Sequence, residues 1–104
     1  MQNTGVGIRS IGIYVPDEVR DSEWISRASG IPESVIREKF GIKKVHKARE
    51  EMVSDMAVKA AEKALSGLDP MQIDLVVYCG SEYKDYYLYN CAAAVQHRIG
   101  AENA

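Results

Sequence analysis

Two segments of the chain have the apolar pattern expected of β-strands. Three isoleucines stand among glycine and serine in residues 6–14, and Pro16 closes the segment, which predicts a strand with a bend near Arg9-Ser10. Residues 75–79 are apolar at every position, a pattern typical of strands buried on both faces of a parallel sheet. We therefore expect residues 75–79 to form a central strand, parallel to 6–14 and covered on one face by a helix.

Helical spacing and capping residues predict four helices. The clearest spans residues 55–66, with Ser54 as its N-cap and mostly alanine on the face that would be buried. The others are expected over 21–29, 32–40 and 87–99, and a glycine suited to a helix C-terminus follows each of them. A short strand is expected over 42–46. Strands and helices in this order predict an α/β fold.

Composition and charge exclude several classes of protein. The 104 residues are 46% hydrophobic and 27% charged, as in globular proteins, and no apolar run approaches the ~20 residues of a membrane span. The first residues lack the basic and apolar regions of a secretory signal, so the expected location is cytoplasmic. A net charge of −2 argues against nucleic acid as a partner, and the basic residues of segment 43–49 are interpreted as a solvated edge.

The residue types that most often carry chemistry form no catalytic or metal-binding motif. His46 and His97 lie far apart without a carboxylate at ligand spacing, and are interpreted as surface or packing residues. Cys79 and Cys91 lack the spacing of a metal pair and are expected to be buried, reduced thiols. A tyrosine-rich run over 83–89, with acidic residues interleaved, is interpreted as a pocket wall or a subunit contact.

Five strings make the chain resemble the N-terminal part of the ketoacyl-ACP synthase III enzymes, members of the thiolase superfamily. They occur in the family's order, have compatible gaps and cover nearly the whole chain. The strings are Ile11-Gly12-Ile13-Tyr14-Val15-Pro16, Phe40-Gly41-Ile42-Lys43-Lys44, Val53-Ser54-Asp55-Met56-Ala57, Asp69-Pro70 through Val77, and Ala92 to Gly100. The resemblance implies a thiolase-like α/β/α layered fold with a mixed, largely parallel sheet. Residues 1–104 would be the N-terminal part of its first half, with the remainder of the enzyme absent from this chain.

The resemblance also implies a contact with coenzyme A, for which two registers compete. Bacterial members hold the adenine with the tryptophan of a Glu-Trp-Ile string, and Trp24 lies in such a string. The register set by Gly41-Ile42 instead places Val35 and Lys39 at the family's tryptophan and arginine positions, and keeps the downstream match with a single-residue gap. We therefore expect Val35 and Lys39 to contact coenzyme A without aromatic stacking, and Trp24 to be a packing residue.

For the whole enzyme, the resemblance implies a decarboxylative Claisen condensation of an acyl-CoA with malonyl-ACP. The family's nucleophile is a cysteine at a helix N-terminus after the next strand, and its histidine and asparagine partners come much later. None of these positions falls within the 104 residues, and Cys91 lies a full strand too early. The segment alone is therefore expected to be inactive. Coenzyme A and acyl carrier protein thioesters are the implied substrates, with no cofactor or metal, and the whole enzyme is expected to be a homodimer without a membrane partner.

Two alternatives remain open from the sequence. In an enzyme like 3-hydroxy-3-methylglutaryl-CoA synthase, a glutamate near the end of the corresponding strand acts as general acid and base. Glu82 lies close to that place, although Ser81 competes for it and a solvated loop carboxylate is the plainer interpretation. The second alternative is a non-catalytic interaction domain that only resembles the enzyme.

Overall fold

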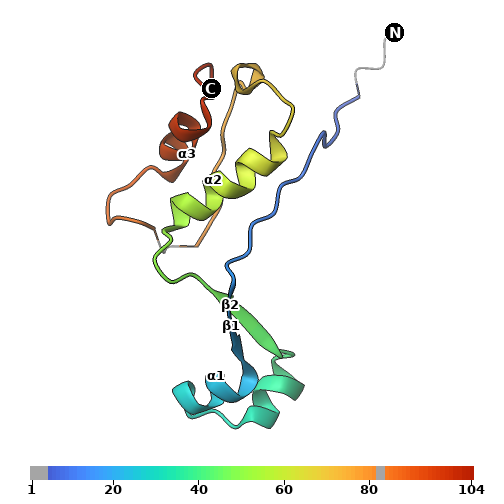
Figure 1. Cartoon of the computed structure of the whole chain (residues 1–104), viewed down its shortest axis with the longest axis vertical. Coiled ribbons are helices and arrows are strands. Elements are labelled where there is room, and N and C mark those ends of the chain that lie inside the picture. Colours follow the sequence, from blue (N-terminus) through green and yellow to red (C-terminus); the bar gives the residue numbers. More distant parts are fainter. Residues whose placement is uncertain (1–4, 82–83) are drawn as a thin grey trace. The chain divides into compact units, whose positions relative to one another are not determined.

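The computed structural model describes residues 5–81 and 84–104, and its elements belong to two units (Figure 1). Unit 1 joins the N-terminal segment through Tyr14 to the residues from Met52 onward, and unit 2 comprises Val15–Glu51. In order along the chain, the elements are β1 (Glu18–Asp21), α1 (Ser22–Ser29), η1 (Val35–Lys39), β2 (Lys44–Lys47), α2 (Val53–Ala64), η2 (Pro70–Gln72) and α3 (Cys91–Ile99).

Unit 2 is built on the antiparallel pair β1–β2, in which Glu18 lies opposite Lys47 and Asp21 opposite Lys44. Asp21 also caps α1, because its carboxylate accepts a hydrogen bond of 2.8 Å from the Trp24 N–H. Gly30 ends the helix in the left-handed conformation, at φ 74°. The expected helix 21–29 and the short strand expected over 42–46 are therefore confirmed within one or two residues.

The second expected helix of unit 2 takes an unusual form. Residues Val35–Lys39 form a π-helix, in which the Phe40 N–H bonds the Val35 carbonyl oxygen at 3.1 Å. Ile36 holds this turn in place, because only 1% of its surface is exposed. Gly41, at φ 70°, then turns the chain into β2. Short π-helical turns are rare and occur frequently at functional sites.

Unit 1 packs α2 against α3 around a small apolar core. Its buried members are Val58 of α2 with Cys91 and Val95 of α3. Half-buried side chains surround them, namely Ala57, Ala61, Val76, Tyr78, Tyr89 and Ile99. Asn90 begins α3 by accepting a hydrogen bond of 3.1 Å from the Ala93 N–H, so the helix starts four residues later than the predicted helix 87–99.

The N-terminal segment lies directly on α2. A methyl group added at Gly12 would overlap the Ala60 carbonyl oxygen and lie 2.5 Å from the Ala64 nitrogen. Two further contacts hold the segment there: the Ser10 hydroxyl donates to the Ala64 carbonyl, and the Lys63 ammonium donates to the Ile13 carbonyl at 3.0 Å. The alanine-rich face of α2 therefore serves to let another backbone approach closely.

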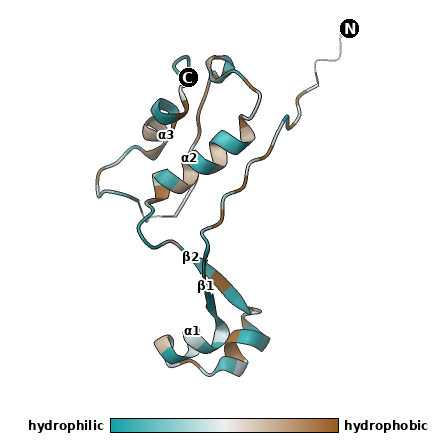
Figure 2. Ribbon diagram, in the orientation of Figure 1, coloured by the Kyte–Doolittle hydropathy of each residue, from teal (hydrophilic) through white to brown (hydrophobic). Residues whose placement is uncertain are grey.

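The two segments expected to be strands have no ladder hydrogen bonds, so that expectation is wrong as stated. Both run as extended chain, and no main-chain hydrogen bond joins residues 5–13 or 74–80 to another segment of the described chain. Val76 packs on the core as predicted, but Val77 is 70% exposed, where burial on both faces was expected. Cys79 is likewise exposed, not buried. Both extended segments contain hydrophobic stretches, brown in Figure 2, and the described residues leave Leu75 and Val77 of the second segment exposed.

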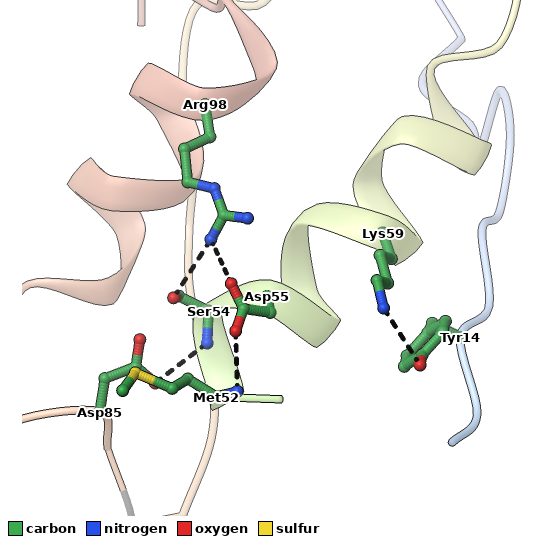
Figure 3. A network of polar contacts seen from close by, with 7 residues as sticks. All are labelled: Tyr14, Met52, Ser54, Asp55, Lys59, Asp85 and Arg98. Carbon is green, nitrogen blue, oxygen red and sulfur yellow. Dashed lines mark hydrogen bonds and ion pairs between the residues drawn. The ribbon is translucent and has the colours of Figure 1, made fainter. Parts of the chain in front are cut away.

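A polar network fixes the N-terminus of α2 (Figure 3). The Asp55 carboxylate accepts hydrogen bonds from the Met52 N–H at 2.8 Å and from the Arg98 guanidinium at 2.9 Å. The Ser54 N–H donates to Asp85 at 3.1 Å. Asp55, rather than Ser54, thus caps the helix, which therefore begins at Val53, before the predicted start. The Met52 N–H and then Arg98 hold the pKa of Asp55 below its ordinary value of 3.8.

Replacing Gly12 by alanine should destabilise unit 1, because the new methyl group meets the backbone of α2, which cannot move aside without breaking helical hydrogen bonds. Overpacking of this kind costs about 1–3 kcal/mol of unfolding free energy. Gly7→Ala is the matched control, since nothing lies within 4 Å of the methyl group it adds. Urea unfolding of both variants is the measurement. Equal midpoints for the two would show that the N-terminal segment does not rest on α2.

Replacing Asp55 by asparagine should lower the melting temperature only where the native carboxylate is ionised. A carboxyl group whose pKa is lowered by folding stabilises the protein above its ordinary pKa, and this contribution is lost as the pH falls through the native value. Above about pH 4 the variant should therefore melt lower than the parent, and below that pH the two should converge. Asp74→Asn, at an exposed site without an ion pair among the described residues, is the control. A difference that is independent of pH would contradict this role for Asp55.

Candidate functional site

The residues expected to meet coenzyme A lie on the π-helical turn of unit 2. Val35 is half-buried and Lys39 is exposed. They are four residues apart in a helix whose hydrogen bonds join residues five apart, so their side chains leave it from roughly the same side. The apolar side chain of Val35 therefore lies beside the flexible Lys39, whose ammonium can pair with a phosphate as a point charge.

Trp24, the competing candidate, is held by two cations of its own unit. The guanidinium carbon of Arg20 lies 4.8 Å from the centroid of the indole ring, and the Lys47 ammonium lies 6.0 Å from it. Such contacts stabilise by about 0.5–1 kcal/mol at exposed sites. Because the ring already links α1 to the β1–β2 pair, an adenine stacked on it would compete with these cations. This arrangement favours the packing role predicted for Trp24, although the ring is 38% exposed.

Glu18 organises the basic side chains of this unit. Its carboxylate pairs with Arg20 and Arg49, and the hydrogen bond from Arg49 is the main reason why the pKa of Glu18 lies below its ordinary 4.5. Lys43, Lys44 and Lys47 are exposed, as expected of a solvated edge. No local sequence signal predicts the pairing of Glu18 with Arg49, because these residues are 31 apart and the β1–β2 register brings them together.

Cys91 occupies the first turn of α3, where the helix dipole would favour a thiolate. Burial opposes this effect and dominates it. The side chain is 4% exposed, and desolvation, helped by the negative charge of Asp85, raises the pKa of the thiol above its ordinary 9.0. Cys91 is thus a packing residue, as expected. It borders a cavity of about 350 Å³ that is lined by Tyr78, Lys84, Tyr89, Asn90, Cys91 and Ala92.

The remaining candidates show no catalytic arrangement. The ring nitrogen Nδ1 of His46 lies 2.7 Å from the Pro16 carbonyl oxygen, and His97 is exposed on α3. In the described ranges, no three His, Cys, Asp or Glu side chains are grouped to hold a metal ion, and no helix is long and apolar enough to cross a membrane. Glu82 lies outside the described residues, so its role in the alternative enzyme stays a prediction.

No protein-family model matches the chain. The beta-ketoacyl-(acyl-carrier-protein) synthase III of Sulfurimonas denitrificans is 35% identical over 99 residues, which cover 91% of this chain and 30% of that protein. The enzyme of the same name from Prochlorococcus marinus is 35% identical over 103 residues, or 96% of this chain and 30% of that protein.

A solved structure gives the same result. The 3-oxoacyl-(acyl carrier protein) synthase III of Pseudomonas aeruginosa PAO1 superposes with a TM-score of 0.77 at 27% identity, over 91% of this chain and 29% of that one. The chain thus spans about 30% of the length of the curated relatives it matches. It is homologous, over nearly its whole length, to a segment of beta-ketoacyl-(acyl-carrier-protein) synthase III, which confirms both the resemblance and the thiolase-like α/β class predicted from the sequence.

Proposed function

We propose that these 104 residues are the N-terminal part of a 3-oxoacyl-ACP synthase III-type condensing enzyme. The whole enzyme would transfer an acyl group from coenzyme A to a cysteine and condense it with malonyl-ACP, with loss of carbon dioxide. The observation that carries this proposal is the match of about nine-tenths of the chain, in sequence and in fold, to synthases of that name. Fatty acid or related biosynthesis in the cytoplasm is the process that such an activity would serve.

Within this enzyme, the segment would contribute to primer binding and leave the bond-forming chemistry to residues elsewhere. Val35 and Lys39 would border the coenzyme A site, the former with apolar contact and the latter with charge. The buried thiol of Cys91 and its raised pKa support a nucleophile outside these residues, because a nucleophilic cysteine needs thiolate character and access.

Assembly as a homodimer is part of the proposal. It is supported by the aromatic run before α3, where Tyr87 is 98% exposed and Leu88 is 89% exposed. Large apolar side chains this open are typical of surfaces that meet another polypeptide.

The proposed activity can be tested in a chimera in which this chain replaces the matching segment of the Sulfurimonas denitrificans relative. The chimera should release carbon dioxide from malonyl-ACP when acetyl-CoA is the primer. Val35→Trp should restore stacking on adenine, worth about 1–3 kcal/mol, and so lower the Michaelis constant for the primer by about one to two decades. Trp24→Ala is the control, and should lower the melting temperature without changing that constant.

Two results would contradict the proposal. A folded chimera that releases no carbon dioxide would argue against a place for this segment in a condensing enzyme. A tenfold rise in the Michaelis constant on Trp24→Ala, at an unchanged melting temperature, would assign the adenine contact to Trp24 and exclude the register that favours Val35.

A further inference from the structure

Ser22, the first residue of α1, has a buried hydroxyl that does not cap its own helix. Only 2% of the residue is exposed, and the neighbouring Asp21 already caps α1 through its carboxylate. The Ser22 hydroxyl instead donates to the Glu33 carboxylate at 2.7 Å. The same carboxylate oxygen pairs with Arg37, inside the π-helical turn η1, at 3.6 Å. Because buried polar groups nearly always have a hydrogen-bond partner, the contact outside the helix accounts for a hydroxyl at this position.

The main chain of Ser22 binds the other end of the same segment. Its N–H donates to the Lys43 carbonyl oxygen at 3.0 Å. The hydroxyl and the N–H of one residue therefore hold the two ends of residues 33–43. This segment contains the π-helical turn η1, with Val35 and Lys39 at its first and last positions. A single buried residue thus fixes where the chain enters this part of unit 2 and where it leaves.

The exit end of the segment is joined to the hydrogen-bond register of the turn. In an α-helix, the Phe40 N–H would bond the Ile36 carbonyl oxygen, four residues earlier. Here the Ile42 N–H donates to that oxygen at 3.0 Å, and the Phe40 N–H bonds Val35, five residues earlier, at 3.1 Å. This register decides how the side chains of Val35 and Lys39 are spaced around the turn.

We propose that Ser22 is a positioning residue for coenzyme A, because it keeps η1 in the π-helical register that presents Val35 and Lys39 to the ligand. Ser22 itself does not contact the ligand and acts through the two ends of residues 33–43. The inference rests on the proposed function, in which Val35 and Lys39 border the coenzyme A site. If loss of the hydroxyl leaves the turn in the competent register for about a tenth of the time, the apparent Kd rises about tenfold.

The test compares two variants of the chimera that each lose one hydroxyl of α1. Ser22→Ala removes the bond to the carboxylate outside the helix, whereas Ser29→Ala, the matched control, removes a bond of the same length, 2.7 Å, to a main-chain carbonyl of α1. Calorimetric titration with coenzyme A gives the Kd, and hydrogen exchange at the Phe40 and Ile42 amides reports opening of the turn. Ser22→Ala should raise the Kd about tenfold and speed exchange at both amides, and Ser29→Ala should change neither.

Glu33→Ala removes the same bond from its half-buried partner, and so tests the inference even where Ser22→Ala does not fold. Since both substitutions break one interaction, the double variant should bind coenzyme A no more weakly than either single variant. In a chimera that condenses, Ser22→Ala should raise the Michaelis constant for acetyl-CoA and leave kcat within about twofold, because the chemistry lies elsewhere.

The outcomes separate this inference from the proposed function. A raised Kd in Ser22→Ala but not in Ser29→Ala, in a chimera that releases no carbon dioxide, supports the positioning role and refutes the condensing enzyme. An unchanged Kd in both Ser22→Ala and Glu33→Ala overturns the positioning role, whether or not carbon dioxide is released. Additive losses in the double variant overturn it as well, as does a folded parent chimera that does not bind coenzyme A.

Discussion

The close approach of the N-terminal backbone to α2 is the contact on which unit 1 depends. It requires glycine at position 12, because a methyl group there would overlap the helix backbone at Ala60 and Ala64. The hydrogen bonds from Ser10 and Lys63 hold the segment in this position. Ile11 and Ile13, on either side of Gly12, remain largely exposed.

The same unit shows how burial and helix polarity compete. Asp55 and Cys91 both lie in the first turn of a helix, where negative charge is favoured. Asp55 is accessible and receives two hydrogen bonds, so its pKa falls. Cys91 is buried beside an acidic residue, so its pKa rises. Solvent access thus decides which of the two side chains is charged. Because Cys91, the only cysteine at a helix terminus among the described residues, is buried, it is unsuited to act as a nucleophile.

Local sequence signals predicted the helices well and the strands poorly. Asp21, Gly30 and Gly100 mark helix ends through hydrogen bonds and φ angles that depend only on nearby residues. Ser54 was predicted as the N-cap of α2, but the Asp55 carboxylate accepts the hydrogen bond from the Met52 N–H, as a side chain three residues inside a helix can. The strand over 75–79 depends on neighbours distant in sequence, so its pattern predicted burial that the described residues do not supply. The coenzyme A contact of Val35 and Lys39 is a prediction that rests on the family register. The cations around Trp24 are brought there by the pairing of β1 with β2, which local sequence does not predict.

The proposed function requires that this segment support a condensing enzyme whose nucleophile lies outside it. Mass spectrometry of the chimera after a brief incubation with acetyl-CoA, without malonyl-ACP, tests it directly because the acyl-enzyme accumulates when the second substrate is missing. An acetyl thioester is expected on a cysteine outside the 104 residues, with Cys79 and Cys91 unmodified. An acetyl thioester on Cys91 would contradict the proposed function.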